Sequence, residues 1–157
     1  MTDNPFWDYS LNLYQRPGIT QLCIDLQDRY GANVNLVLFA CWVGNRGRQL
    51  DGSNLRAALA EISDWNTRVT QPLRTRRRAL DPAGAGTAQE KQRLLAEELD
   101  AEQEEQTRLR NWYDAHSVSL PVSPREEAIV QNLMRYLAML GADGEPPQLL
   151  VATALEG

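Results

Sequence analysis

Apolar positions along the chain follow helical spacing, except in one run that has no polar side. The run is Leu36–Val43, eight consecutive apolar residues between Asn33 and Gly44. Leu, Phe, Ala, Cys and Trp dominate it, so the β-branched enrichment that is typical of a buried strand is weak. Asn33 suits an N-cap, and a helix that is apolar on all sides belongs at the centre of a bundle. We therefore predict a central helix over Val34–Val43.

Two shorter amphipathic helices are predicted before this run. Asn4 and Pro5 have the pattern of an N-cap followed by proline at the first helical position. The helix that they open ends at the helix-breaking segment 16–18 (RPG). A second apolar stripe has helical spacing and stops at Gly31. Its members are Ile19, Leu22, Cys23, Leu26 and Tyr30.

A long helical hairpin is predicted over residues 53–114. Apolar residues from Leu55 to Leu80 keep helical phase, and the phase continues through Pro72, which predicts a kink there rather than a break. Residues 81–87 (DPAGAGT) have the composition of a turn, and Ala88–Tyr113 form the second arm.

The last predicted helix opens at Ser123 and Pro124 and ends at Gly141. Residues 143–157 contain two consecutive prolines, which favours a loosely ordered tail unless its segment 149–151 (LLV) docks on the bundle. The predicted fold is all-α. It is a single-domain bundle of about five to six helices over residues 1–142, followed by that tail.

Four segments of the chain resemble a family of short bacterial helical proteins, a domain of unknown function. They are FWDYSLNLYQRPG, CIDLQDRYGANVNLVLFACW, WNTRVTQPLRTRRRAL and AEELDAEQEEQTRL, in this order, and together they span Pro5 to Leu109. The resemblance implies no activity, cofactor or site residue, because none is established for that family.

Composition is that of an ordinary globular protein. The 157 residues are 43% hydrophobic and 24% charged, which fits one domain with a real core. The N-terminal segment MTDNPFWDYS has no basic or apolar leader, and no apolar run approaches the roughly 20 residues of a membrane span. We expect a cytoplasmic protein with free, buried Cys23 and Cys41. The net charge of −5 disfavours a broad nucleic-acid surface but leaves room for a local basic patch.

Such a patch is predicted at the tip of the hairpin and is called the basic tip below. It has a functional interpretation, as an anion site for RNA phosphates or an acidic protein, and a structural one, as a solvated helix end. If the hairpin is symmetric about Gly84, the acidic run Glu97–Glu105 faces residues 63–71 and does not neutralise the arginines directly. The basic tip comprises Arg74, Arg76, Arg77, Arg78, Lys91 and Arg93.

A polar seam is predicted between the two arms. The second arm has an apolar stripe of Leu94, Leu95, Leu99 and Leu109, and three polar residues fall inside it. The symmetric register puts Asn66 of the first arm near Glu102. Buried carboxylates need partners, for which Arg68 or Arg76 are candidates. The polar seam comprises Asn66, Glu98, Glu102 and Gln106.

The seam has two interpretations. It is either a structural layer that fixes the helix register, or a metal or acid–base site. His116 is the only histidine and no Glu-x-x-His pair occurs, so we expect no metal and no other cofactor. Phosphate-binding loops, Gly-x-Gly-x-x-Gly and Cys-x-x-Cys are absent from the sequence. Asn35 is expected to be a hydrogen-bonded core amide, and the Asp25–Asp28 pair a solvated helix face.

Three functions remain open at this level. The first is a non-catalytic interaction module that binds a protein partner, which the shortage of catalytic groups favours. The second is an RNA- or ribosome-associated protein that uses the arginines Arg74–Arg78. The third is a ligand-binding protein or enzyme built on Glu98 and Glu102.

Overall fold

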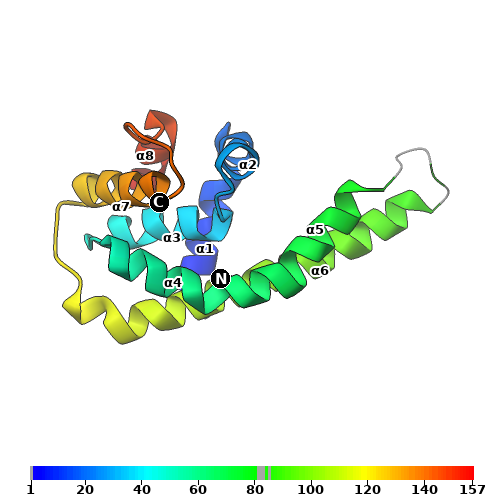
Figure 1. Ribbon diagram of the computed structural model, residues 1–157, viewed down its shortest axis with the longest axis horizontal. Coiled ribbons are helices and arrows are strands. Elements are labelled where there is room, and N and C mark those ends of the chain that lie inside the picture. The colour runs from blue at the N-terminus through cyan, green and yellow to red at the C-terminus, as the bar shows by residue number, and fades with distance from the viewer. Residues whose placement is uncertain (1, 81–83, 85) are drawn as a thin grey trace.

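The computed structural model is helical throughout and describes residues 2–80, 84 and 86–157. A body of helices carries a long hairpin whose far end projects away from it (Figure 1). The body contains α1 (Pro5–Tyr14), α2 (Ile19–Tyr30), α3 (Val34–Asn45), α7 (Arg125–Met139) and α8 (Gln148–Glu156). The hairpin contains α4 (Gly52–Trp65), the π-helical segment η1 (Asn66–Thr70), α5 (Gln71–Arg78) and α6 (Thr87–His116), and the short 3-10 segment η2 (Ser117–Ser119) leads back to the body. Within the described residues, β-pairing is limited to one isolated bridge between Arg48 and Val122.

Helix α3 lies at the centre of the molecule, as predicted from its apolar run. The Asn33 side chain accepts a hydrogen bond from the Leu36 amide at 3.1 Å and caps the helix. Every residue from Asn35 to Gly44 is buried. The other body helices and α6 pack around α3, and α7 makes the most extensive contact with it. The all-α prediction and the central helix are therefore confirmed.

A buried amide joins α7 to the end of α3. Asn132 is fully buried and accepts a hydrogen bond from the Leu50 amide at 2.7 Å. Its Nδ2 donates to the carbonyls of Ala40 at 3.2 Å and Arg48 at 3.1 Å. This one side chain therefore links α7 both to α3 and to the connection between α3 and α4, and its own polar atoms are satisfied in the core.

The first arm of the hairpin runs through Pro72 without a break, but its irregularity lies before the proline. Segment η1 has π-helical hydrogen bonding, in which the Gln71 amide donates to the Asn66 carbonyl. Proline has no amide hydrogen and its ring crowds the carbonyl four residues earlier. The first arm therefore continues through Pro72 as predicted, and a π segment over residues 66–70 precedes the proline.

The C-terminal segment is not a loosely ordered tail but a helix that docks on the body, which is the alternative given for segment 149–151. Leu150, Val151 and Ala154 of α8 are buried against the body, whereas Leu149 is 48% exposed. The Tyr9 hydroxyl donates to the Ala154 carbonyl at 2.8 Å, and this contact ties α8 to α1. With α8 present and the first arm divided by η1, the chain has more helices than the five to six predicted. Residues 81–83 and 85 of the predicted turn lie outside the described residues.

Both cysteines are free and buried. Burial raises the pKa of the Cys23 thiol to about 12 and also raises that of Cys41, so both stay protonated at neutral pH. Among the described helices, none has the length and apolarity that a membrane crossing requires.

Candidate ligand-binding pocket

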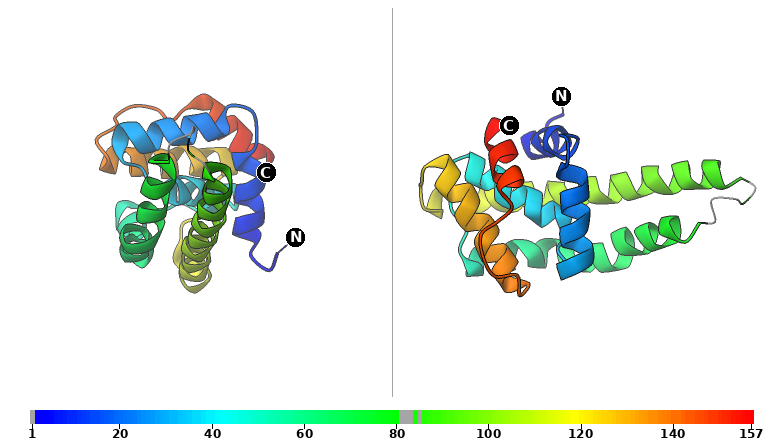
Figure 2. Two further views of the ribbon diagram at one scale, coloured as in Figure 1. Left: turned by 90° about the vertical axis from the view of Figure 1, so that its right-hand side faces the viewer. Right: turned by 90° about the horizontal axis from the view of Figure 1, so that it is seen from above.

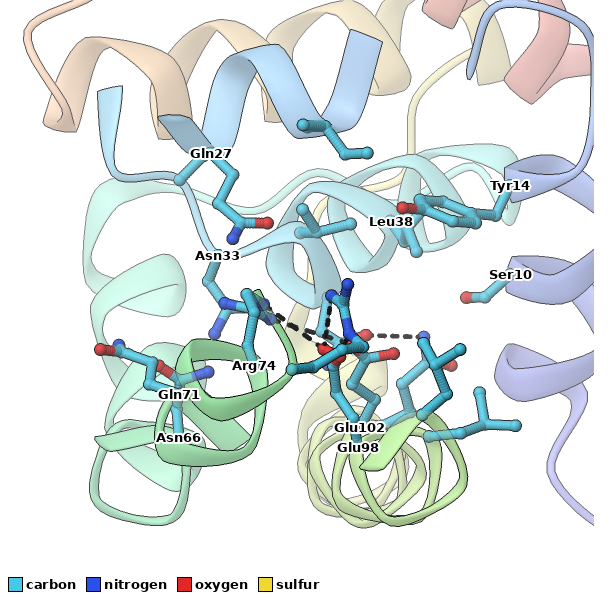
Figure 3. Close-up of a pocket in the computed structure, with 18 of the residues that line it drawn as sticks. Ser10, Tyr14, Gln27, Asn33, Leu38, Asn66, Gln71, Arg74, Glu98 and Glu102 are labelled. Atoms are coloured by element: carbon cyan, nitrogen blue, oxygen red, sulfur yellow. Dashed lines mark hydrogen bonds and ion pairs between the residues drawn. The ribbon is translucent and has the colours of Figure 1, made fainter. Parts of the chain in front are cut away.

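The polar residues of α6 face the inside of the molecule. Glu98 and Glu102 lie one turn apart and point into the pocket, where both contact Arg74 of α5 (Figure 3). Glu98 is 5% exposed and Gln106 is 2% exposed, whereas the Glu102 side chain keeps 32% of its surface accessible. The structure therefore places these three residues of the polar seam along one inward face of the second arm.

The register between the arms differs from the symmetric one that we assumed. Asn66 donates to Glu105 at 3.1 Å and not to Glu102, so its partner lies almost one turn further along α6. Arg68 does not fold into the seam but pairs with Asp64 at the surface. Arg76 stays exposed. The prediction that Arg68 or Arg76 donates to the carboxylates of the seam is therefore wrong.

Two other arginines of the basic tip fold into the seam. Arg77 donates from Nε and one terminal nitrogen to the two oxygens of Glu98, each at 3.0 Å, which is a bidentate pair. Arg74 lies 3.8 Å from Glu98 and 3.7 Å from Glu102, and these ion pairs are too long to be hydrogen bonds. Because residues 74 and 77 are three apart on α5, both project toward the carboxylates of α6.

Two of the four remaining cations of the basic tip are paired as well. Arg78 lies 3.3 Å from Asp28 of α2, and Arg93 pairs with Glu90 and Glu97 on its own helix. Only Arg76 and Lys91 form no ion pair within the described part of the chain. The expectation that the acidic run leaves the arginines without neutralising partners is wrong, because Glu98 and Glu102 contact them directly.

Glu105, which the sequence interpretation passed over, is the centre of a buried polar network. It is fully buried and has no cation within 4 Å among the described residues. Four neutral donors surround it instead. The donors are Asn33 at 3.2 Å, Asn35 at 3.3 Å, Asn66 at 3.1 Å and the hydroxyl of Thr70.

The network joins three parts of the fold. Asn33 and Asn35 come from the start of α3, and Asn66 and Thr70 come from the two ends of the π segment. Gln106 extends the network by donating to Asn35 at 2.9 Å. Asn35 is thus the hydrogen-bonded core amide that we expected, and its partner is a carboxylate of the hairpin.

A pocket of about 610 Å³ lies beside this network, where the hairpin meets the body. Figure 2 shows α2 crossing the hairpin near its base, and residues of α1, α2, α3, η1, α5 and α6 line the hollow. Its size is typical of small-molecule sites. Three leucines of its lining are between 41% and 46% exposed, namely Leu11, Leu95 and Leu99.

Two of these leucines belong to the predicted apolar stripe of the second arm but are not buried between the arms. Leu94 and Leu109 are buried as expected, but Leu95 and Leu99 face the pocket and remain accessible. The arms of the hairpin contact each other through a narrower strip of α6 than the sequence pattern indicates.

Two buried polar atoms in the pocket wall have no hydrogen-bond partner among the residues that the structure describes. They are the Ser10 hydroxyl oxygen and Gln106 Oε1, and each residue is only 2% exposed. Figure 3 shows the Ser10 side chain directed toward the cavity from α1. Buried polar groups are nearly always satisfied, so this part of the wall has a capacity for hydrogen bonds that the protein does not use.

Glu102 is the titratable group in the pocket that is most suited to proton exchange. Burial, reinforced by the neighbouring Glu98 carboxylate, raises the pKa of Glu102 to about 7, against the opposing effect of Arg74. Burial also raises the pKa of Tyr14, which lines the same pocket. A carboxyl with a pKa near neutrality can donate or accept a proton, or act as a neutral hydrogen-bond donor.

We predict that Glu102→Gln changes how stability depends on pH. Between pH 4.5, the ordinary pKa, and about 7, the folded protein keeps a proton on Glu102 that the unfolded chain releases. Stability therefore falls as pH rises through this window, and glutamine removes that loss. At pH 8 urea denaturation of the variant should give a free energy of unfolding about 1–2 kcal/mol above wild type, allowing for solvent screening, with no difference at pH 4.

Glu104→Gln is the matched control, because Glu104 lies on the same helix and pairs with Arg108 at the surface. This variant should keep the pH dependence of the wild type. If Glu102→Gln and Glu104→Gln have the same pH profile, Glu102 does not retain its proton in the folded state.

The other polar motifs of the sequence are exposed or lie at the far end of α6. Both aspartates of the Asp25–Asp28 pair are exposed on α2, as expected: Asp25 accepts a hydrogen bond from Gln21 at 2.8 Å, and Asp28 lines the pocket beside Arg78. His116 stacks on Trp112 at the far end of α6, with 4.5 Å between the ring centroids. Among the described residues, no three His, Cys, Asp or Glu side chains are grouped to hold a metal ion.

The fold and the pocket define an all-helical protein with a polar cavity between a hairpin and a helical body. A family model described as protein of unknown function (DUF2390) matches residues 5–109, and the chain belongs to that family. The matched region runs from α1 through most of α6 and includes every residue of the polar seam and the basic tip. Neither a curated protein nor a solved structure matches the chain.

Proposed function

We propose that this protein binds a small organic molecule in the pocket between the hairpin and the body. The observation that carries the proposal is a cavity of about 610 Å³ whose wall contains buried polar atoms without a partner in the described part of the chain. A cavity with a few convergent polar groups and a group of perturbed pKa is the usual form of a ligand site. This function corresponds to the third of the three that the sequence left open.

A purely structural polar layer accounts for less of the geometry. Such a layer explains the bidentate Arg77–Glu98 pair and the donors around Glu105, since all of these groups are satisfied. It does not explain why Arg74 points into the cavity with only long ion pairs. Nor does it explain why Leu95 and Leu99 face a hollow in place of a packed neighbour.

The two other functions have less support from the contacts. An RNA-binding surface would need free cations on the outside of the protein, and Arg77, Arg78 and Arg93 are paired with carboxylates, while Arg74 lies in the pocket. The role of an interaction module, and the cytoplasmic location that goes with it, stay predictions from the sequence. Among the described residues, no specific contact supports either of these two functions.

The proposal predicts that the neutral fluorescent probe N-phenyl-1-naphthylamine binds saturably at one site. Leu99→Trp places an indole in the cavity and should weaken that binding at least about tenfold. The indole takes up space that the probe needs, and an apolar ligand that buries less surface binds more weakly. The measurement is a fluorescence titration of the full chain, with circular dichroism to confirm that the variant is folded.

Leu149→Trp is the matched control, since Leu149 is 48% exposed and Leu99 is 46% exposed, but Leu149 lies on α8 outside the pocket. The control should bind the probe as the wild type does. Absence of saturable binding, or equal loss of binding in both variants, would overturn the proposed site.

A further inference from the structure

We infer that the ligand is an amphiphilic monocarboxylate, bound through its carboxylate to Arg74 with its hydrocarbon chain on Leu11, Leu95 and Leu99. The inference rests on the proposed function and specifies the chemical class of the ligand. Three features of the pocket support it: the pairing of its charges, the state of Glu102 and the position of the leucines.

One cation of the pocket has ion pairs but no hydrogen bond among the described residues. Arg77 is held by two hydrogen bonds to Glu98, and Arg78 lies 3.3 Å from Asp28. Arg74 makes no hydrogen bond to any described residue, although its side chain is only 19% exposed. Its guanidinium carries five N–H donors in a planar fork that matches a carboxylate in shape and charge.

The groups around Glu102 favour an anion over a cation. From α6 it faces Glu98 and Glu105, from α5 Arg74 and Arg77, and from α1 Tyr14. With its pKa near 7, Glu102 is protonated in a large fraction of molecules at neutral pH and then acts as a hydrogen-bond donor. A bound carboxylate can accept from this carboxyl and pair with Arg74, whereas a bound cation would lie against the Arg74 charge.

The apolar part of the ligand has a defined place. Leu95 and Leu99 are one turn apart on α6 and share a face, while Leu11 reaches the same hollow from α1. Exposed leucines that converge on one cavity from two helices form a surface that a hydrocarbon chain would cover. Ser10, next to Leu11, adds an unpartnered hydroxyl at this wall.

Displacement of N-phenyl-1-naphthylamine by a series of eight-carbon compounds tests the class of ligand. Octanoate should displace the probe at concentrations at least about tenfold below octan-1-ol and octylammonium, because among the three only octanoate can form a bidentate ion pair with Arg74. Butyrate should be weaker than octanoate by more than about tenfold, since it buries four fewer methylene groups. Octanoate affinity should also decrease from about pH 6 to about pH 8, as Glu102 loses its proton.

Arg74→Gln should weaken octanoate about 10- to 100-fold and leave octan-1-ol unchanged. Arg76→Gln is the control, because Arg76 lies on the same helix but is exposed and outside the pocket lining. The comparison of compounds on the wild-type protein does not depend on how Arg74→Gln folds.

The possible outcomes separate the two proposals. If octan-1-ol or octylammonium competes as well as octanoate, or if Arg74→Gln binds octanoate normally, the carboxylate assignment is overturned while the pocket remains a ligand site. If no compound of the series displaces a probe that binds saturably, the ligand is not an amphiphile and the inference fails. If the probe itself does not bind saturably, the proposed function fails.

Discussion

Glu105→Leu should lower the free energy of unfolding by about 4 kcal/mol, although leucine fills nearly the same volume. The carboxylate is the shared acceptor for three amides and one hydroxyl, all of which remain when it is removed. Each buried donor that loses its acceptor costs about 1–3 kcal/mol, less where water from the adjacent pocket replaces the lost bond. Replacing a buried charge by an apolar group is harmless only when its partners are replaced too.

The measurement is chemical denaturation of Glu105→Leu beside Glu104→Leu. Glu104 is the next residue on α6, half exposed and paired with Arg108, so its substitution should change stability by about 0.5 kcal/mol or less. Glu105→Gln keeps the shape and one acceptor oxygen and should lie between the two. If Glu105→Leu is as stable as Glu104→Leu, the network around Glu105 does not hold the hairpin on the body.

Gly44→Ala should lower the free energy of unfolding by about 3 kcal/mol or more. A methyl group at this position would lie 2.6 Å from both the Cα and the amide nitrogen of Ile129, where α3 crosses α7. These are backbone atoms, so the two helices must separate along the most extensive contact of the fold. Truncating the Ile129 side chain should therefore not rescue the variant.

Gly52→Ala is the matched control for this prediction. Its added methyl group would meet only the Arg56 guanidinium, at 3.3 Å, which is the mobile end of a long side chain. Alanine is also the better helix former, so stability should be unchanged or slightly higher. Equal melting temperatures for Gly44→Ala and Gly52→Ala would contradict the close packing of α3 on α7.

The elements that the sequence predicts well are those with strong local signals. The all-round apolar run at residues 36–43 can only be satisfied inside a bundle, and Asn33 marks its start. Helix α8 was harder to predict, because its few apolar residues follow two prolines and are held by contacts with distant helices, such as that between Tyr9 and Ala154.

The polar seam was located by helical phase, but its partners depend on three-dimensional register. The register changes with the π segment and with the connection between the arms, and neither is visible in the apolar pattern. Arg74 and Arg77 therefore take the place that we gave to Arg68 and Arg76. The burial of Glu105 could have been predicted, because Glu105 lies seven residues after Glu98 and therefore on the same face of α6.

The pocket itself could not be predicted from the sequence. Leu95 and Leu99 belong to the apolar stripe of their helix, and only the placement of α1 and α2 determines that they line a cavity and not a core. A hollow between helices depends on where neighbouring elements stop, which periodicity within one helix does not encode.

The most direct test of the ligand site is an NMR measurement of intermolecular nuclear Overhauser effects on the full chain with bound N-phenyl-1-naphthylamine. We expect contacts between the aromatic protons of the probe and the methyl groups of Leu11, Leu95 and Leu99, which line the pocket between hairpin and body. Contacts confined to Leu22 and Leu26, which line a separate hollow between α2 and Pro147, would contradict a ligand site at the hairpin.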